Sequence, residues 1–98
     1  MTISKTLEGN DMTLGLEGAL DTTSSPGLKL ELLLSMDSID SLTFDFKDLE
    51  YVTSAGLRVL LLAHNTMAPK GGMKIIHVNK VIMDTLTVTG LTKVLNVE

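Results

Sequence analysis

The chain has no cysteine and few aromatic residues. Its 98 residues contain no Cys and no Trp, and Phe and Tyr together make up only 3 %. The missing thiols exclude disulfides, thiol catalysis and cysteine-ligated zinc or iron–sulfur clusters. The hydrophobic fraction of 44 % predicts a folded domain, whose core must be aliphatic and built from Leu, Val, Ile and six Met.

Basic segments and long apolar runs are also missing. The net charge is −4, and no basic block or aromatic-basic interleaving suggests nucleic-acid binding. The longest apolar stretch, residues 59–63, is far shorter than the ~20 residues that span a bilayer. The first ten residues lack the basic and apolar regions of a signal peptide. We therefore expect a cytoplasmic protein that binds neither nucleic acid nor membrane.

The hydrophobic periodicity predicts one α/β domain over residues 1–98, with the element order β-β-α-β-α-β-α-β. Helices between strands imply a mixed, mostly parallel sheet of about five strands with the helices packed against it, and the first strand antiparallel. A turn at residues 8–11 joins strands one and two into a hairpin. Residues 18–21 follow the second strand and end the hairpin. Residues 47–52 are expected to form a connection. The predicted strands are 3–7, 12–16, 42–47, 73–78 and 94–97.

Three helices are expected. The first has Pro26 in its first turn and an apolar face formed by Leu28, Leu32 and Met36, with Leu33 beside them. The second opens at residues 53–56 and is apolar almost all round, so it should be the most buried. The third is expected to be capped by Asn79 at its start and by Gly90 at its end.

Few residues offer catalytic chemistry, and we expect no bound cofactor or metal. The only histidines, His64 and His77, have no carboxylate at ligand spacing on the same element, and no phosphate-binding glycine loop is present. Ser54 lies on a strand-to-helix turn, where a nucleophile could lie. However, Val52 occupies the first glycine position of the hydrolase elbow. An enzyme is therefore less favoured than either of the two binding functions described below.

The turn Thr53-Ser54-Ala55-Gly56 has a plain interpretation and a functional one. A Ser or Thr side chain at the helix start can cap a free backbone N–H, which contributes ~1 kcal/mol. A helix N-terminus also tolerates an added phosphate, because its free N–H groups carry partial positive charge. Phosphorylation of Ser54 would place about two negative charges on the surface and expel a partner bound there.

The segment from Phe44 to Leu60 resembles the signature of the STAS domain family, which is named for sulfate transporters and anti-sigma-factor antagonists. The family pattern is a strand ending in Asp, a short apolar loop, then Asp-Ser-Ser-Gly-Leu and a helix. Residues 18–21, Gly-Ala-Leu-Asp, resemble the family's Gly-x-Leu-Asp. Residues 81–95 resemble its third helix and closing strand. The resemblance covers essentially the whole chain.

This resemblance implies an anti-sigma-factor antagonist that is not an enzyme. Such a protein binds an anti-sigma factor that is also a serine kinase, and phosphorylation, here at Ser54, releases it. A metal-dependent (PP2C-type) serine phosphatase restores the binding form. Asp21 corresponds to an acidic position at the rim of the partner surface. The expected partner-binding residues are Asp21, Thr22, Thr23, Asp48, Thr53, Ser54, Gly56 and Arg58.

Two residues depart from the family pattern. Thr53 stands where the family has Asp, which removes a negative charge beside the acceptor, and Ala55 replaces the second Ser. Ser54 is then the acceptor unless Thr53 competes. Thr53 slightly favours a second interpretation, a non-phosphorylated scaffold subunit of a lipid or anion transport complex. Arg58, one helical turn after Ser54, could pair with a phosphate or be an ordinary solvated charge.

Overall fold

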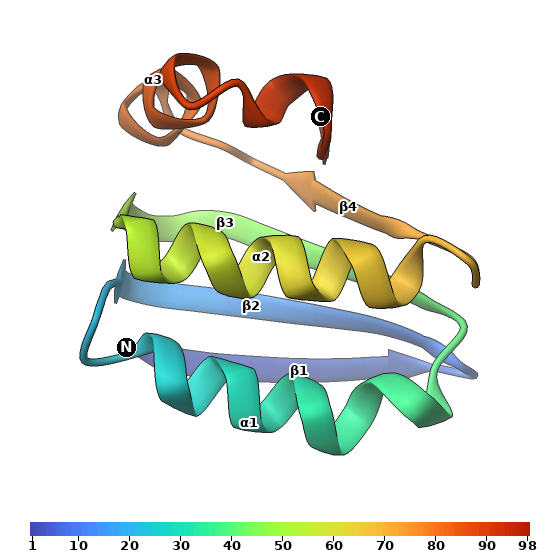
Figure 1. The fold of residues 1–98 in the computed structure, drawn as a ribbon. Helices are drawn as coiled ribbons and strands as arrows, with labels where there is room; N and C mark the ends of the chain where they lie inside the picture. Colours follow the sequence, from blue (N-terminus) through green and yellow to red (C-terminus); the bar gives the residue numbers. More distant parts are fainter.

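The computed structural model describes residues 1–98 as a five-stranded sheet with three α-helices (Figure 1). Two short 3-10 helices, η1 and η2, follow α1 and α3. No helix has the length and apolar character needed to cross a membrane. The elements are β1 (Thr2–Glu8), β2 (Asp11–Leu20), α1 (Ser25–Ser35), η1 (Met36–Ser38), β3 (Ser41–Val52), α2 (Ser54–Met67), β4 (Met73–Ile76), α3 (Lys80–Val88), η2 (Leu91–Lys93) and β5 (Asn96–Val97).

The sheet has the strand order β1-β2-β3-β4-β5. The first pair is antiparallel and the three others are parallel. This confirms the predicted mixed sheet and the order of its elements. The hairpin turn at Gly9 has a positive φ of 63°, which glycine adopts readily.

The two central strands are longer than predicted. β2 continues to Leu20 and β3 to Val52, so residues 18–20 and 47–52 belong to strands and not to a hairpin closure and a connection. The prediction missed these residues because the pairing of β2 with β3 has two register shifts, at Gly15/Glu17 and at Gly18/Ala19. Such bulges interrupt the two-residue alternation from which a strand is predicted. At the other edge, β4 and β5 are shorter than predicted.

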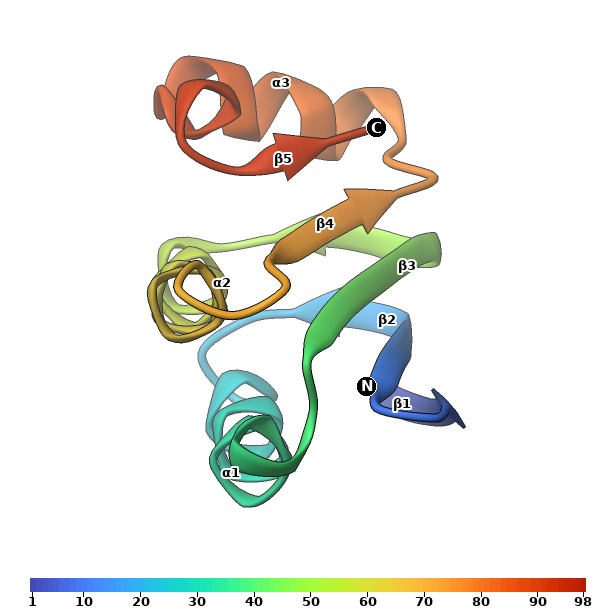
Figure 2. The same ribbon diagram turned by 90° about the vertical axis from the view of Figure 1, so that its right-hand side faces the viewer.

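The helices α1 and α2 lie on the same side of the sheet (Figure 2). Alternate residues of β2 and β3 face them and form the core, while polar residues cover the opposite side of the sheet. The only two Phe residues, Phe44 and Phe46, lie in this core with ring centroids 5.8 Å apart. The other core side chains are aliphatic, as the composition predicts.

The helices bury their faces to different extents. In α2, six of fourteen residues are buried, against four of eleven in α1, which confirms that α2 is more buried. Leu28, Leu32 and Met36 are in the core as predicted. Leu33, which was expected beside them, has 55 % of its surface exposed.

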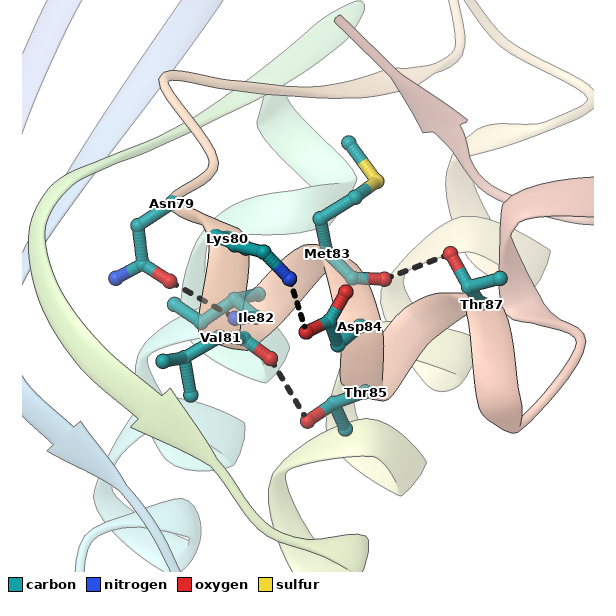
Figure 3. Close-up of polar contacts among 8 residues, drawn as sticks. All are labelled: Asn79, Lys80, Val81, Ile82, Met83, Asp84, Thr85 and Thr87. Atoms are coloured by element: carbon teal, nitrogen blue, oxygen red, sulfur yellow. Dashed lines mark hydrogen bonds and ion pairs between the residues drawn. The ribbon is translucent and has the colours of Figure 1, made fainter.

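The third helix has the predicted caps. The Asn79 side-chain oxygen accepts a 2.8 Å hydrogen bond from the Ile82 N–H, shown as a dashed line in Figure 3. The same side chain donates to the Leu49 carbonyl at 2.9 Å and so fixes α3 to β3. Gly90 follows with a φ of 77°, the left-handed conformation that commonly ends a helix.

Candidate functional site

The candidate site lies where β2 and β3 end at the same edge of the sheet. The last residues of these parallel strands are paired, with Leu20 opposite Val52. The Thr53 N–H donates a 2.9 Å hydrogen bond to the Leu20 carbonyl oxygen and joins the two chain segments. The loop that starts at Asp21 and the turn into α2 therefore lie side by side, at the left of Figure 1. In open sheets, binding sites commonly form at the carboxyl ends of parallel strands.

Ser54 is the first residue of α2, and its side chain is exposed. The N-cap residue is Thr53, which makes no side-chain capping bond, and its Oγ1 is buried without a hydrogen-bond partner. The predicted Ser/Thr cap is therefore wrong, because the Thr53 hydroxyl is buried within the protein. The N–H groups of Ser54 and Ala55 form no hydrogen bond within the protein. Free donors thus lie beside an exposed hydroxyl.

Gly56 allows α2 to start close to the strand ends. The residue is buried, and a Cβ placed on it would lie 2.6 Å from Leu20 Cγ and 2.9 Å from both the Leu20 carbonyl oxygen and Val52 Cγ1. These distances are shorter than van der Waals contact, so only glycine fits without movement of the strands. Gly56 positions the site by packing and offers no side chain to a partner.

Asp21 fixes the loop between β2 and α1. Its Oδ1 accepts hydrogen bonds from the N–H groups of Thr23 and Ser24, both at 3.0 Å, and from the Ser24 hydroxyl at 3.1 Å. The Ser24 N–H bond holds the pKa of the Asp21 carboxyl below its ordinary value. Partial desolvation opposes this shift, and the Ser24 hydroxyl and Thr23 N–H reinforce it. Ser24 was not among the predicted site residues, although Asp and Ser are both preferred at helix starts. Thr22 and Thr23 are exposed.

This loop makes stability depend on pH. Because the pKa of folded Asp21 is lowered, its carboxylate stabilises the fold above the unfolded pKa of ~3.9, and this contribution is lost as pH falls through the folded pKa. Wild type should therefore be more stable than Asp21→Asn at neutral pH. The difference should shrink below about pH 4. Urea denaturation of both proteins between neutral and acidic pH measures it.

The control for this prediction is Asp37→Asn. The Asp37 carboxylate accepts no hydrogen bond in the structure, so this variant reports the general effect of removing a negative charge. A wild-type advantage over Asp21→Asn that is equally large at both ends of the pH range would contradict the role assigned to Asp21.

Not all predicted binding residues come together. Asp48 lies on the polar side of the sheet, in a depression that Glu17 and Lys47 also line. Arg58 is exposed on α2, one turn beyond Ser54. The site at the strand ends therefore consists of the Asp21 loop and the first turns of α2, and Asp48 is apart from it.

The histidines do not complete a catalytic arrangement with Ser54. His64 is ten residues further along α2, which corresponds to ~15 Å of helix. His77 Nδ1 lies 2.9 Å from Asp45 Oδ1. Desolvation acts to raise the pKa of Asp45, but hydrogen bonds from His77 and the Lys47 N–H outweigh it and lower that pKa. No group of three His, Cys, Asp or Glu side chains is arranged to hold a metal ion.

The fold and the site together define a class of small α/β domain, in which a strand-to-helix turn meets the loop after the second strand. The chain belongs to the STAS domain family, because the family described as "Mlab, STAS domain" matches residues 3–96. No curated protein matches the chain.

Several solved structures have the same fold. An anti-sigma factor antagonist from Mycobacterium paratuberculosis has a TM-score of 0.87 at 20 % identity, covering 98 % of this chain and 83 % of that one. The Bacillus cell fate determinant SpoIIAA in its phosphorylated form has a TM-score of 0.77 at 12 % identity, covering 99 % and 91 %. SLC26A9 matches 86 % of this chain with 16 % of its own length, at 10 % identity and a TM-score of 0.72. At these identities, the likeness establishes the fold.

Proposed function

We propose that this STAS domain is a cytoplasmic antagonist of an anti-sigma factor and that phosphorylation of Ser54 switches it off. The observation that carries the proposal is the exposed Ser54 hydroxyl beside the free N–H groups at the start of α2. The fold shared with an anti-sigma factor antagonist and with a phosphorylated relative supports it. The protein acts by binding and releasing a partner, without catalysis.

The local structure favours Ser54 over Thr53 as the acceptor. The Thr53 Oγ1 is buried, so a kinase cannot reach it without unfolding the turn. A phosphate on Ser54 would accept hydrogen bonds from the free N–H groups and would lie at the positive end of the helix dipole, so the fold tolerates it. Arg58, which has no ion-pair partner in the structure, lies one turn away and is free to pair with it.

Two partners follow from this proposal. The first is an anti-sigma factor with serine kinase activity, which binds the unphosphorylated surface formed by the Asp21 loop and the start of α2. The second is a PP2C-type serine phosphatase, which removes the phosphate. The added charge of about −2 expels the kinase without a change of fold.

The test uses each kinase-type anti-sigma factor encoded in the source genome. Purified protein is incubated with each factor and ATP, and peptide mass spectrometry locates the phosphate. We expect one phosphate, on Ser54, and none on Ser54→Ala. A phosphate confined to another residue, or no phosphate with any of the factors, would remove the switch from the proposal.

A second candidate function is a scaffold subunit of a transport complex. Two observations favour it: Thr53 removes the family's Asp, and the same fold occurs as a small part of SLC26A9. In this case Ser54 stays unmodified and the same surface holds a transporter ATPase. Affinity purification from the source organism distinguishes the two candidates, because a transporter ATPase and a kinase cannot both be the main partner.

A further inference from the structure

A groove separates the first turns of α1 and α2, next to Ser54. Its volume is about 400 Å³, and Pro26 and Lys29 line it from α1, while Ala55, Arg58 and Val59 line it from α2. The walls are thus largely aliphatic, with a cation from each helix. This groove continues the surface at the strand ends, because Thr22 of the Asp21 loop also lines it.

The groove is basic in a protein whose net charge is −4. Lys29 and Arg58 are both exposed, and neither forms an ion pair within the protein. No carboxylate lines the groove. The nearby Asp21 side chain bonds to the N–H groups of its own loop. Two cations are therefore available to negative groups of a bound molecule.

An apolar stripe on α1 extends from the groove along the solvent side of the helix. It consists of Pro26, Leu30, Leu33 and Leu34, at the i, i+4, i+7, i+8 spacing of one helix face. The three leucines have 59 %, 55 % and 72 % of their surface exposed. Because α1 packs its opposite face into the core, it is apolar on two sides and buries only one. Contiguous exposed apolar surface of this kind marks an interaction site.

We propose that the groove and the α1 stripe bind an amphipathic helix of the partner protein. Its apolar face would cover Leu30, Leu33 and Leu34, and its carboxylates would pair with Lys29 and Arg58. The charge complementarity of an acidic helix to two unpaired cations carries this assignment. The inference rests on the proposed function, that the surface beside Ser54 binds a protein, and it names the chemistry of that partner.

Two other occupants fit the same surface less well. A second copy of the chain in a two-fold contact would bring four cations to one interface with no carboxylate from the groove between them. A lipid surface requires a helix rich in Lys and Arg on its polar face. α1 carries only Lys29, together with the acidic Glu31.

An acidic helix in this position explains why phosphorylation causes release. The phosphate on Ser54 would add negative charge at the end of the groove where the partner's carboxylates lie. It would also compete for Arg58, one turn along α2. The partner's carboxylates then lose their contact with Arg58 and are repelled by the phosphate, while the fold of the domain stays the same.

The experiment titrates the isotope-labelled full chain with two synthetic helices and follows backbone amide shifts by NMR. Both are stapled peptides of ~18 residues, about five turns, with identical leucines. One has Glu and the other Lys at the positions that flank the leucine face. We expect the Glu peptide to shift amides along α1 and the first turns of α2, and the Lys peptide to bind at least tenfold more weakly.

Charge and apolar variants test the two halves of the proposal. Lys29→Glu with Arg58→Glu should lower affinity for the Glu peptide at least tenfold and raise affinity for the Lys peptide. Lys93 is an exposed cation on η2 without an ion pair, and Lys93→Glu should leave the affinities for both peptides unchanged. The double variant Leu30→Gln with Leu33→Gln should also lower affinity for the Glu peptide at least tenfold. Val88→Gln, which replaces an exposed residue of α3, is the matched control.

Four outcomes would overturn the inference. They are equal binding of both peptides, shifts confined to residues outside α1, α2 and the Asp21 loop, a concentration-dependent dimer lost in Leu30→Gln, and α1-dependent binding to anionic phospholipid vesicles. The peptide assay does not depend on Ser54 phosphorylation. If the kinase test fails and the Glu peptide binds, the groove assignment stands without the switch. If the kinase test succeeds and the Glu peptide does not bind, the groove assignment alone is wrong.

Discussion

Phosphorylated protein is expected to bind the proposed partner, an anti-sigma factor, at least about 100-fold more weakly than unphosphorylated protein, and Ser54→Asp about tenfold more weakly. The reason is charge at the centre of the proposed interface, where the start of α2, the Asp21 loop and the groove meet. Aspartate has a smaller effect because it carries one negative charge, whereas the phosphate carries about 1.5 to 2. Titration calorimetry with the purified factor measures both constants.

Two controls separate charge from shape and position. Ser54→Asn has nearly the same size as Ser54→Asp but no charge, and it should bind within about threefold of wild type if repulsion is the cause. Ser4→Asp places the same charge on β1, on the polar side of the sheet, and should leave binding unchanged. Equal affinities for the phosphorylated and unphosphorylated proteins would refute the switch.

Gly56→Ala is expected to lower the free energy of unfolding by about 2 kcal/mol, the usual cost of overpacking a core site. The melting temperature of a domain this small should then fall by roughly 10 °C. The physical reason is the Cβ, which would lie 2.6 Å from Leu20 Cγ and 2.9 Å from the Leu20 carbonyl oxygen. The helix can only make room by moving away from the strand ends. Thermal denaturation followed by circular dichroism measures the change.

Gly27→Ala is the matched control for this substitution. A Cβ on Gly27 meets nothing within 4 Å, and the residue lies in the first half of α1. Because alanine favours a helix more than glycine does, this variant should gain about 0.5–1 kcal/mol. If Gly56→Ala were as stable as Gly27→Ala, the close contact between α2 and the strand ends would be wrong.

The periodicity of the sequence predicts the order of the elements because the two central strands begin with strict alternation. Leu42, Phe44 and Phe46 all point into the core, as alternation requires. The periodicity does not predict where β2 and β3 end, because the register shifts begin at the middle of both strands and interrupt the alternation there. The consequence matters for the site, since Leu20 and Val52 become paired strand residues and give the following turns a fixed position.

The candidate site was only partly predictable. The strand-to-helix turn and the resemblance to the STAS signature identify Ser54. Its exposure was not predictable from its place as the first helical residue, because Ser25, the first residue of α1, is buried. The orientation of the Thr53 hydroxyl was not predictable, because Thr at an N-cap normally accepts a backbone N–H. Asp48 was expected on the partner-binding surface near Ser54. The extension of β3 past Asp48 instead places it on the other side of the sheet. Lys29 was missed because its relation to Arg58 depends on how two helices pack.

The hydrogen bond between the Thr53 N–H and the Leu20 carbonyl also bears on how fast such a protein can respond. Both loops of the proposed interface start from paired strand ends, so the binding surface is pre-organised and little conformational entropy is lost when a partner binds. A switch built on this frame needs no slow rearrangement before release. The time course of signalling would then be set by the kinase, the phosphatase and the dissociation rate of the complex, and the domain itself would add no delay.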